Sequence, residues 1–328
     1  MKKIYLVTGA SGHLGSTLLN RLLEKGQTVR CFVLPGEEKY LPDGVEVFVG
    51  DVCDKASLFP FFQNENGDEL ILLHCAGIVT ISSKKNPLVR KVNVEGTRNV
   101  LELALAAKTG RVVYVSSVHA LLEADEADTK EADHFEPWKI DDPYGKSKAE
   151  ASNLALEYAR KGLNISIVHP TGITGPGDIR NTNHSVRSFK AMMKGYIPVG
   201  LKGGFDFVDV RDVAEGIILC ADKGKQGDCY ILGGHYVKIC ELLKQINQLC
   251  GRRTLNIELP YGLVKTAAPL AEKFCDLFKI RSLITPYSIA ILNGNGHFSH
   301  EKAKIELGYE ARPIRDTLKD MYVEVKRR

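Results

Sequence analysis

The sequence lacks the cysteine and histidine groupings that mark metal centres and disulfide-bonded proteins. Its eight cysteines include no C-x-x-C pair, and none of their spacings matches that of a metal-ligand set. They are interpreted as small buried hydrophobic residues in a reducing compartment. Among the nine histidines, His297 and His300 are close together, but no further ligand candidates stand near them in the sequence. The sequence therefore predicts no metal site.

Long uncharged apolar runs are also missing, which argues against an integral membrane segment. The best candidate, residues 261–280, is interrupted by Lys265, Glu272, Lys273 and Asp276. It is expected to form an amphipathic helix over a substrate pocket, with peripheral membrane contact as the alternative. The first residues lack the apolar run and the small-residue cleavage site of a signal peptide. A cytoplasmic location is expected.

No stripe of lysine and arginine interleaved with aromatic residues is present. The formal net charge of the 328 residues is +4, and charges of both signs are interspersed along the chain. The basic end EVKRR is interpreted as a solvated tail. These features argue against a nucleic-acid partner.

What the sequence does contain is a regular alternation of short apolar runs and helix-length amphipathic segments. Strands are expected at 3–8, 28–34, 45–50, 69–75, 111–117 and 165–170, with one more at 229–234. Helices are expected to end near Lys25, to span 86–107 with Asn86 as N-cap, and to begin at 141–148. This alternation predicts parallel pairing with right-handed crossovers. The predicted fold class is α/β, a Rossmann-type doubly wound parallel sheet.

Three glycines follow the first strand at intervals of three residues and open the first helix. Glycine permits a tight turn and lets a pyrophosphate approach the backbone, while the helix dipole favours its negative charge. A simple strand-to-helix turn is the alternative, but the strand–turn–helix context is that of a dinucleotide fingerprint. The residues of this turn that are predicted to bind the nucleotide are Gly9, Ser11, Gly12, His13, Leu14 and Gly15.

The alternation loosens after about residue 170, where glycine- and proline-containing loops separate shorter elements. Residues 1–170 are predicted to form the dinucleotide-binding Rossmann domain, with later strands around 205–235 returning to it. Residues 171–328 are predicted to form mainly a substrate-binding lobe at the carboxyl ends of the strands, where an open α/β sheet binds its ligand. Asp209, Arg211 and Asp212 are expected to tie the two parts together.

The end of the second strand is where NAD and NADP would be distinguished. A carboxylate there accepts hydrogen bonds from the ribose hydroxyl of NAD, whereas the 2′-phosphate of NADP needs a cation. Val33 and Leu34 occupy this position, so no carboxylate stands there to repel a phosphate, and Lys39 could reach one. Arg30 is a second cation, unless its side chain points to the other face of the strand. The sequence leans towards NADP, with NAD as the alternative.

Tyr144 and Lys148 open the helix that begins near residue 141. Residues four apart lie on one face of a helix, so these two side chains are neighbours. A free tyrosine titrates near pH ~10. A close ammonium, the helix N-terminus and an oxidised nicotinamide ring would together favour its anion. The alternative interpretation is ordinary surface chemistry near a helix end, as expected for Lys146.

A series of motifs in a fixed order resembles the extended branch of the short-chain dehydrogenase/reductase superfamily, the NAD-dependent epimerase/dehydratase family. The motifs are TGASGHLG (8–15), GDV (50–52), HCAG (74–77), VNVEGTRNV (92–100), YVSS (114–117), YGKSK (144–148), HPTGITGPGD (169–178) and FVDVRDVAEG (207–216). Within the branch, the chain is most similar to dihydroflavonol-reductase-like and 3β-hydroxysteroid-dehydrogenase-like members. Many relatives have arginine where this chain has His169, which weakens the case for a nucleotide-sugar phosphate contact there.

The resemblance implies a Ser-Tyr-Lys catalytic triad. Tyr144 would be the general acid/base, and Lys148 would bind the nicotinamide ribose and lower the pKa of Tyr144. Ser117 would hydrogen-bond the substrate oxygen, with Ser116 as the alternative if the alignment is shifted by one. Asn93 would act in a structural hydrogen bond or in a proton relay. Further residues expected at the cofactor are Leu34, Lys39, Asp51, Val52, Cys75, Ala76, Gly77, Ser116, Pro170, Gly172 and Ile173, a loop cap being the alternative for Asp51.

The function that these motifs indicate is hydride transfer between a nicotinamide and a ketone, an aldehyde or a secondary alcohol. A nucleotide-sugar epimerase that uses bound NAD is the alternative, and a non-catalytic nucleotide-sensing protein is a third hypothesis. A 4,6-dehydratase is disfavoured because Val118 and His119 follow Ser117 where such enzymes carry an Asp-Glu pair. A homodimer joined through the helices that begin near Pro87 and Pro143 is implied. The small-molecule substrate is expected to be bulky and partly apolar, in a pocket built from residues roughly 79–85, 118–140, 174–206 and 260–300.

Overall fold

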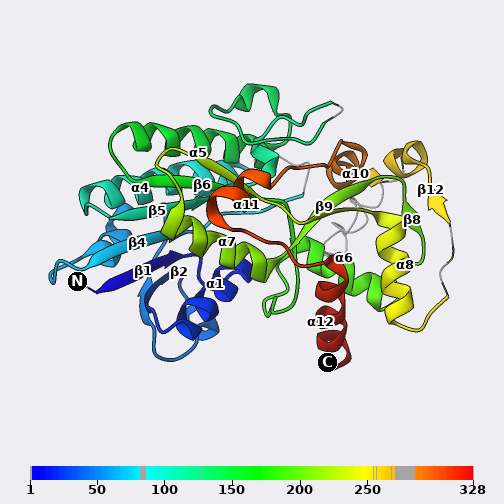
Figure 1. Cartoon of the computed structure of the whole chain (residues 1–328), viewed down its shortest axis with the longest axis horizontal. Coiled ribbons are helices and arrows are strands. Elements are labelled where there is room, and N and C mark those ends of the chain that lie inside the picture. Colours follow the sequence, from blue (N-terminus) through cyan, green and yellow to red (C-terminus); the bar gives the residue numbers. More distant parts are fainter. Residues whose placement is uncertain are drawn as a thin grey trace.

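A seven-stranded parallel sheet forms the centre of the computed structural model, which describes residues 2–81, 86–125, 127–253, 255, 257–266, 268–269 and 285–327 (Figure 1). The strand order is β10-β6-β5-β4-β1-β2-β3. The bounds are β1 (Lys3–Thr8), β2 (Thr28–Val33), β3 (Glu46–Val49), β4 (Glu69–His74), β5 (Arg111–Val115), β6 (Ile165–Pro170) and β10 (Cys229–Leu232). The predicted doubly wound parallel sheet is confirmed, because every strand runs the same way and the order reverses at β1.

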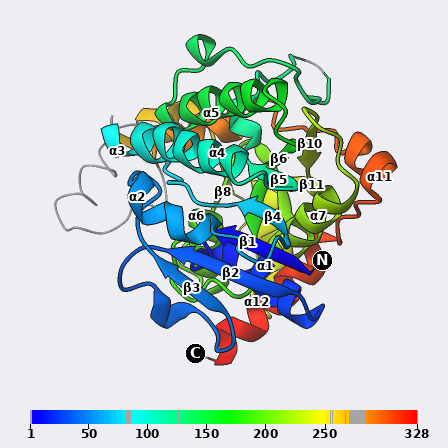
Figure 2. The same ribbon diagram turned by 90° about the vertical axis from the view of Figure 1, so that its left-hand side faces the viewer.

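Helices cover both faces of this sheet and bury two separate apolar cores. On one face lie α1 (His13–Glu24), α7 (Val210–Lys223) and α11 (Glu301–Leu307); on the other lie α2 (Lys55–Leu58), α4 (Thr97–Ala106) and α5 (Pro143–Arg160). Figure 2 shows α4 and α5 together on one side of the strands. Because successive strand residues point to opposite faces, Leu72 joins the α4–α5 core and Leu73 the α1–α7 core. Because both faces of these strands are buried, their sequences are continuous apolar runs.

The predicted helix at 86–107 begins as expected but is not a single α-helix. Asn86 caps it through a hydrogen bond from the backbone N–H of Leu88, and Pro87 is the first helical residue. The α-helix α3 (Pro87–Arg90) then gives way to a π-helical segment, η3 (Lys91–Gly96), before α4 begins. A π-helical turn inserts an extra residue and is frequent at functional sites.

A smaller lobe lies beyond the carboxyl ends of the central strands, at the right of Figure 1. It contains a three-stranded sheet, β11-β9-β7, and a two-stranded sheet, β12-β8. Its elements are β7 (Gly172–Thr174), α6 (His184–Met193), β8 (Gly200–Leu201), β9 (Gly204–Asp209), β11 (His235–Lys238), α8 (Ile239–Leu249), β12 (Glu258–Leu259), α10 (Pro286–Asn293) and α12 (Ile314–Arg327).

Short 3-10 helices occur in the segment before residue 140. They are η1 (Glu38–Tyr40), η2 (Phe59–Phe62), η4 (Val118–Ala120) and η5 (Pro137–Lys139).

The strands between residues 205 and 235 belong to two different sheets. β10 pairs with β6 in the large sheet. β9 pairs with β7 and β11 in the three-stranded sheet. All six residues of β9 are buried, and a strand pattern alone does not specify which sheet a strand joins.

Ionic and hydrogen-bonded contacts join α7, which covers the large sheet, to the C-terminal segment. Thr317 donates a hydrogen bond of 2.7 Å to Asp209, the N-cap of α7. The guanidinium of Arg312 lies 2.7 Å from the carboxylate of Asp212. Asp209 also pairs with Arg211 at 2.7 Å. These contacts place the three predicted residues at the junction of the two parts.

Within the described residues, no helix has the length and apolarity needed to cross a bilayer. The amphipathic helix predicted at 261–280 falls largely outside the described part of the chain, which includes only residues 261–266 and 268–269 of it. The predicted pocket segment 79–85 is likewise described only up to residue 81.

Candidate active site

The glycine turn after β1 packs directly against the end of β4. Gly9 has a φ of +69°, and a Cβ atom there would lie 2.8 Å from Cα of Ala76. A Cβ atom at Gly15 would collide with the carbonyl oxygen of Gly9. Any side chain at either position would therefore push the turn away from the sheet.

The first turn of α1 offers its backbone N–H groups to an anion. Its N-cap, Gly12, provides no side-chain cap, and no acidic residue lies in the first turn. Uncapped N–H groups and the positive end of the helix dipole are what a pyrophosphate requires. The turn therefore fits the dinucleotide predicted for it. Of the other predicted residues, Leu14 packs into the α1–α7 core, while Ser11 and His13 hydrogen-bond groups outside the turn.

The predicted small residues Cys75, Ala76 and Gly77 follow β4 at the same edge. A Cβ atom at Gly77 would lie 3.1 Å from Oδ1 of Asn93 and 3.4 Å from Nζ of Lys148. Gly77 thus leaves room above the lysine ammonium. Burial raises the pKa of the Cys75 thiol to about 12, so it remains protonated at neutral pH.

Asn93 lies in the π-helical segment and uses its amide to hold the chain after β4. Its Oδ1 accepts from the N–H of Ile78 at 2.8 Å, and its Nδ2 donates to the carbonyl of Ile78 at 3.0 Å. The same Nδ2 donates to Oγ of Ser147 at 2.9 Å. Two roles were considered for Asn93, a structural hydrogen bond and a proton relay. These bonds favour the structural role, because both the oxygen and the nitrogen of its side-chain amide already have partners.

Ser117, Tyr144 and Lys148 come together at the carboxyl end of β5. Tyr144 is the second residue of α5, whose start is set by Asp142 as N-cap and Pro143 at the first position. The side chain of Ser117 acts on the phenol of Tyr144 and lowers its pKa in part. Lys148 lies one helical turn further, with its Nζ donating to the carbonyl of Val115 at 2.8 Å. All three side chains are at most 6% exposed.

Burial dominates the electrostatics of the pair. It raises the pKa of Tyr144 to about 12, although the side chain of Ser117 lowers it in part. Burial also lowers the pKa of Lys148 to about 8. The lowering of the Tyr144 pKa by Lys148 stays a prediction. Burial of the phenolate costs more free energy than its neighbouring groups recover. The ammonium of Lys148 is directed at the Val115 carbonyl and the ring of Tyr114.

Ser116 and Ser117 point in opposite directions. The Oγ of Ser116 lies 2.7 Å from Oγ of Ser152, inside the core between β5 and α5. The Oγ of Ser117 also accepts from the backbone N–H of His119 at 3.3 Å. The structure thus brings Ser117, and not the side chain of Ser116, to Tyr144.

His169 supports this strand end, a role that sequence reasoning missed. Its Nδ1 donates to the backbone carbonyl of Ser117 at 3.0 Å from the neighbouring strand β6. Burial lowers the pKa of His169 to about 4, so the ring is neutral at neutral pH. Pro170 follows it, and Gly172 and Ile173 open β7 beside the same edge of the sheet.

The loop after β2 brings a carboxylate back to the glycine turn. Glu37, three residues beyond Leu34, accepts a hydrogen bond of 2.5 Å from Oγ of Ser11 in that turn. Leu34 is 47% exposed, and the ammonium of Lys39 lies 5.2 Å from the ring centroid of Tyr40. The sequence analysis considered only the strand end itself and did not foresee this contact of Glu37.

The remaining predicted residues at this edge have local partners. Arg30 points to Glu46 on β3 at 2.7 Å, so it faces away from the glycine turn. The Oδ1 of Asp51 accepts from the N–H of Cys53 at 2.9 Å, which is the loop-cap arrangement considered for it. Val52 is buried and its carbonyl accepts from Asn99.

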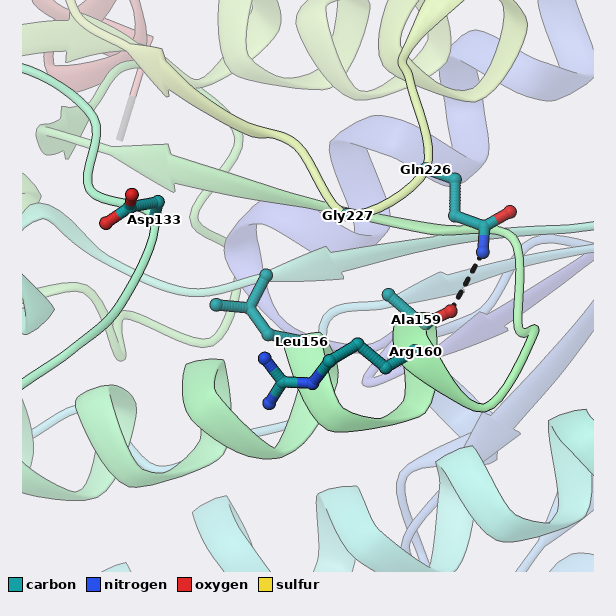
Figure 3. Close-up of a pocket in the computed structure, with 6 residues that line it drawn as sticks. All are labelled: Asp133, Leu156, Ala159, Arg160, Gln226 and Gly227. Atoms are coloured by element: carbon teal, nitrogen blue, oxygen red, sulfur yellow. Dashed lines mark hydrogen bonds between the residues drawn. The ribbon is translucent and has the colours of Figure 1, made fainter.

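A cavity of about 270 Å³ lies at the opposite edge of the sheet (Figure 3). It is lined by Asp133, Leu156, Ala159, Arg160, Gln226 and Gly227. Gln226 closes one side by donating to the carbonyl of Ala159 at 2.8 Å. The cavity is near the C-terminal end of α5 and the start of β10, whereas the triad is at the carboxyl ends of the strands. It is therefore separate from the candidate active site.

Comparison with known proteins places this fold and site in a family. Residues 5–233 match the NAD dependent epimerase/dehydratase family. The chain is 31% identical over 312 residues to sterol demethylase protein B of Methylococcus capsulatus, covering 92% of each chain. It is 27% identical to a 3-beta-hydroxysteroid dehydrogenase of Mycolicibacterium neoaurum, covering 93% of this chain and 86% of that protein.

A solved structure shares the fold at lower identity. The UDP-glucose 4-epimerase of Thermus thermophilus, in complex with NAD, is 19% identical, with a TM-score of 0.74 and coverage of 98% of this chain and 99% of that chain. The likeness therefore covers the smaller lobe as well as the Rossmann-type sheet. With its motifs in the predicted order, the chain belongs to the NAD dependent epimerase/dehydratase family, the extended branch of the short-chain dehydrogenases/reductases.

Proposed function

We propose that the protein is an NAD(P)-dependent oxidoreductase that interconverts a secondary alcohol and a ketone. The observation that carries the proposal is the meeting of three buried side chains, Ser117, Tyr144 and Lys148, where β5 ends and α5 begins. A bound nicotinamide supplies or accepts the hydride. Nucleotide contacts are assigned to the glycine turn and to the residues predicted after β2, β3, β4 and β6.

The triad residues handle the proton and the substrate oxygen. Ser117 donates a hydrogen bond to that oxygen, and Tyr144 gives it a proton during reduction or removes one during oxidation. With a pKa of about 12, Tyr144 is protonated at neutral pH and is ready to act as the acid. Lys148, whose pKa is about 8, keeps its positive charge near neutrality and is assigned to the nicotinamide ribose. Its charge favours the tyrosine anion that oxidation requires.

The surroundings of the triad favour a bulky apolar substrate. Val79, after β4, is 71% exposed, and Leu122, after β5, is 43% exposed. The ring of His119 lies 5.9 Å from Tyr144 and stacks on Phe205 at 5.7 Å. Apolar and aromatic side chains at the carboxyl edge suit a fused-ring alcohol or ketone. The names of the two curated relatives, a sterol demethylase protein and a hydroxysteroid dehydrogenase, agree with this substrate class.

The epimerase alternative requires cations for a sugar diphosphate, and the basic residues after β7 include Arg180 and Lys190. Arg180 pairs with Glu37 at 2.6 Å, and Lys190 pairs with Glu324 at 3.0 Å. A charge engaged in an ion pair must give up that contact before it can bind a phosphate. This supports the oxidoreductase over the epimerase.

The decisive experiment follows NADH and NADPH consumption by the purified protein with a panel of ring ketones, including 3-ketosteroids. Tyr144→Phe should reduce turnover by about 10²- to 10⁴-fold, because the proton donor is lost. Tyr158→Phe, on the same helix and also buried, is the matched control and should retain turnover. Full activity of Tyr144→Phe would contradict the proposal. If a nucleotide binds but no ketone is reduced, nucleotide sugars become the next substrates.

The preference between nucleotides, the assembly and the location belong to the same proposal. The sequence leans towards NADP, but the carboxylate of Glu37 lies close to the glycine turn, so the experiment compares both nucleotides directly. A homodimer through α4 and α5 is proposed from the family resemblance, and sedimentation equilibrium tests it. A cytoplasmic location is proposed with it.

A further inference from the structure

The ammonium of Lys148 lies against the ring of Tyr114, a residue outside the triad. Nζ of Lys148 is over the ring face, 5.1 Å from its centroid, which is a cation–π distance. Tyr114 belongs to β5 and is fully buried in the core under α5, the helix that carries Lys148. The side chain of Val115 joins the core on the other face of the sheet, while its carbonyl accepts from Nζ at 2.8 Å. Two successive residues of β5 therefore contact one ammonium.

The strand beside β5 holds the ring of Tyr114 in place. His74 on β4 pairs in register with Tyr114, and the two rings stack with their centroids 5.6 Å apart. The two ring nitrogens of His74 are hydrogen-bonded to the hydroxyls of Thr8 and Thr97, at 2.7 and 3.0 Å. The imidazole is thus fixed on both sides, and it fixes the tyrosine ring that it stacks on.

Packing alone would explain a buried aromatic residue, so the contact must be judged by what Lys148 requires. Lys148 is 4% exposed, and no carboxylate in the described part of the chain forms an ion pair with it. Such an ammonium loses hydration without gaining a counter-ion, and burial lowers the pKa of Lys148 to about 8. The negative face of an aromatic ring recovers part of that cost, because it attracts a cation most strongly where water is excluded.

The other titratable groups that face Lys148 keep one charge state near neutral pH. Burial lowers the pKa values of His74 and His169 to about 3 and about 4, so both rings are neutral. Burial raises the pKa values of the Cys75 thiol and of Tyr144 to about 12, and it also raises the pKa of the phenol under the ammonium. Within this set, Lys148 is the group that titrates near neutrality.

We propose that Tyr114 is a positioning residue whose ring face holds the ammonium of Lys148 in the site and keeps it charged at neutral pH. The inference rests on the proposed function, in which this charge binds the nicotinamide ribose and favours the anion of Tyr144. A lysine ammonium has three donors, and one of them is used by Val115. The other two remain for a ligand on the side of Gly77, where a Cβ atom would lie 3.4 Å from Nζ.

The experiment follows the titration of Lys148 itself, by NMR of the full chain isotope-labelled at the lysine Cε atoms. The signal of Lys148 is the one that Lys148→Arg lacks, and its midpoint in the wild type should lie near pH 8. Tyr114→Leu removes the ring face and should lower the midpoint by about one pH unit, a tenfold loss of proton affinity. Tyr114→Phe keeps the ring and should leave the midpoint within about 0.3 unit.

A form with pentafluorophenylalanine at position 114 tests the ring face with little change in shape, because fluorine withdraws the electron density that attracts the cation. Its midpoint should fall as in Tyr114→Leu, and it serves if the leucine variant does not fold. Tyr158→Leu is the matched control, since Tyr158 is a buried tyrosine of the same core whose ring faces Lys161. It should leave the Lys148 midpoint unchanged. Thermal unfolding shows which forms are folded.

An unchanged midpoint in the fluorinated form, or in a folded Tyr114→Leu, would overturn the proposal and leave Tyr114 as a packing residue. A fall in Tyr114→Phe as large as that in Tyr114→Leu would overturn it as well. These readouts need neither nucleotide nor substrate, so a chain that shows the shift but no turnover defeats only the proposed function. In an active chain, the alkaline fall of kcat/KM should move with the midpoint in Tyr114→Leu, and a fall that stays in place would overturn the link to catalysis.

Discussion

At the scale of single residues, two adjacent serines at the end of β5 have different partners. Ser117 contacts the Tyr144 hydroxyl, whereas Ser116 bonds Ser152 within the core. The roles of the two serines can therefore be tested separately, although the two residues are adjacent in the sequence.

Ser117→Ala should lower kcat/KM for the ketone by about 10²- to 10³-fold, because the donor to the substrate oxygen is removed. Its melting temperature should change little. Ser116→Ala should retain turnover but lower the unfolding free energy by about 1 kcal/mol, because the hydroxyl of Ser152 loses its buried partner. Steady-state kinetics and urea unfolding on both variants check this contrast. The reverse pattern would assign the substrate contact to Ser116.

The residues that the sequence could predict are those placed by local geometry. Tyr144 and Lys148 are four apart on one helix, so their proximity follows from spacing. Ser117 was predicted from the family resemblance, which includes the YVSS motif at 114–117. Glu37 was missed because it belongs to a loop that folds back on Ser11. Its partner Arg180 lies in another lobe, and no local pattern pairs the two. The Tyr144 pKa was missed because burial, which a sequence does not show, outweighs the nearby charge.

At the scale of elements, the start of α5 positions Tyr144, the proposed proton donor. The carboxylate of Asp142 accepts from the N–H of Gly145 at 2.6 Å, and Pro143 is already set for the first helical position. Tyr144 follows at once, so the same cap that begins the helix also fixes the direction of the phenol.

Asp142→Ala should lower the unfolding free energy by about 1 kcal/mol, the usual effect of losing an N-cap. Asp142→Asn keeps an oxygen in place for the same N–H group and should retain most of the stability. Urea unfolding of the two variants and the wild type makes the comparison. Equal losses in both variants would mean that the carboxylate acts through its charge and not as a cap.

Element boundaries were predictable where an apolar run meets a glycine or proline, as for β1, α1 and the cap at Asn86. The π-helical segment was not, because one inserted residue hardly changes the apolar periodicity of a helix. Its cause is tertiary, since Asn93 bonds both Ile78 and Ser147. The place of β9 in the lobe sheet is tertiary as well.

At the scale of the whole molecule, burial of histidines couples stability to pH. Burial lowers the pKa of His74 to about 3 and those of His169 and His184 to about 4, from the ordinary histidine value of 6.5. Above pH 6.5 these rings are neutral in both the folded and the unfolded chain. Below it the unfolded chain takes up protons that the folded chain does not.

The unfolding free energy should therefore fall as the pH decreases from 6.5 towards 4, by up to about 1.4 kcal/mol per pH unit for each histidine. Urea unfolding at several pH values measures this slope. His184→Gln should make it shallower, whereas His134→Gln should not, because the His134 side chain is 75% exposed. A slope that is identical in the wild type and His184→Gln would show that this ring takes no part.

The placement of β10 beside β6 has a consequence for synthesis on the ribosome. Residues 1–170 complete six strands, but the edge of β6 stays unpaired until β10 emerges about 60 residues later. An open strand edge pairs readily with other chains, so a nascent chain halted after β6 is exposed to aggregation. Expression of the first 170 residues alone should yield insoluble protein, and the smallest fragment that folds must reach Leu232.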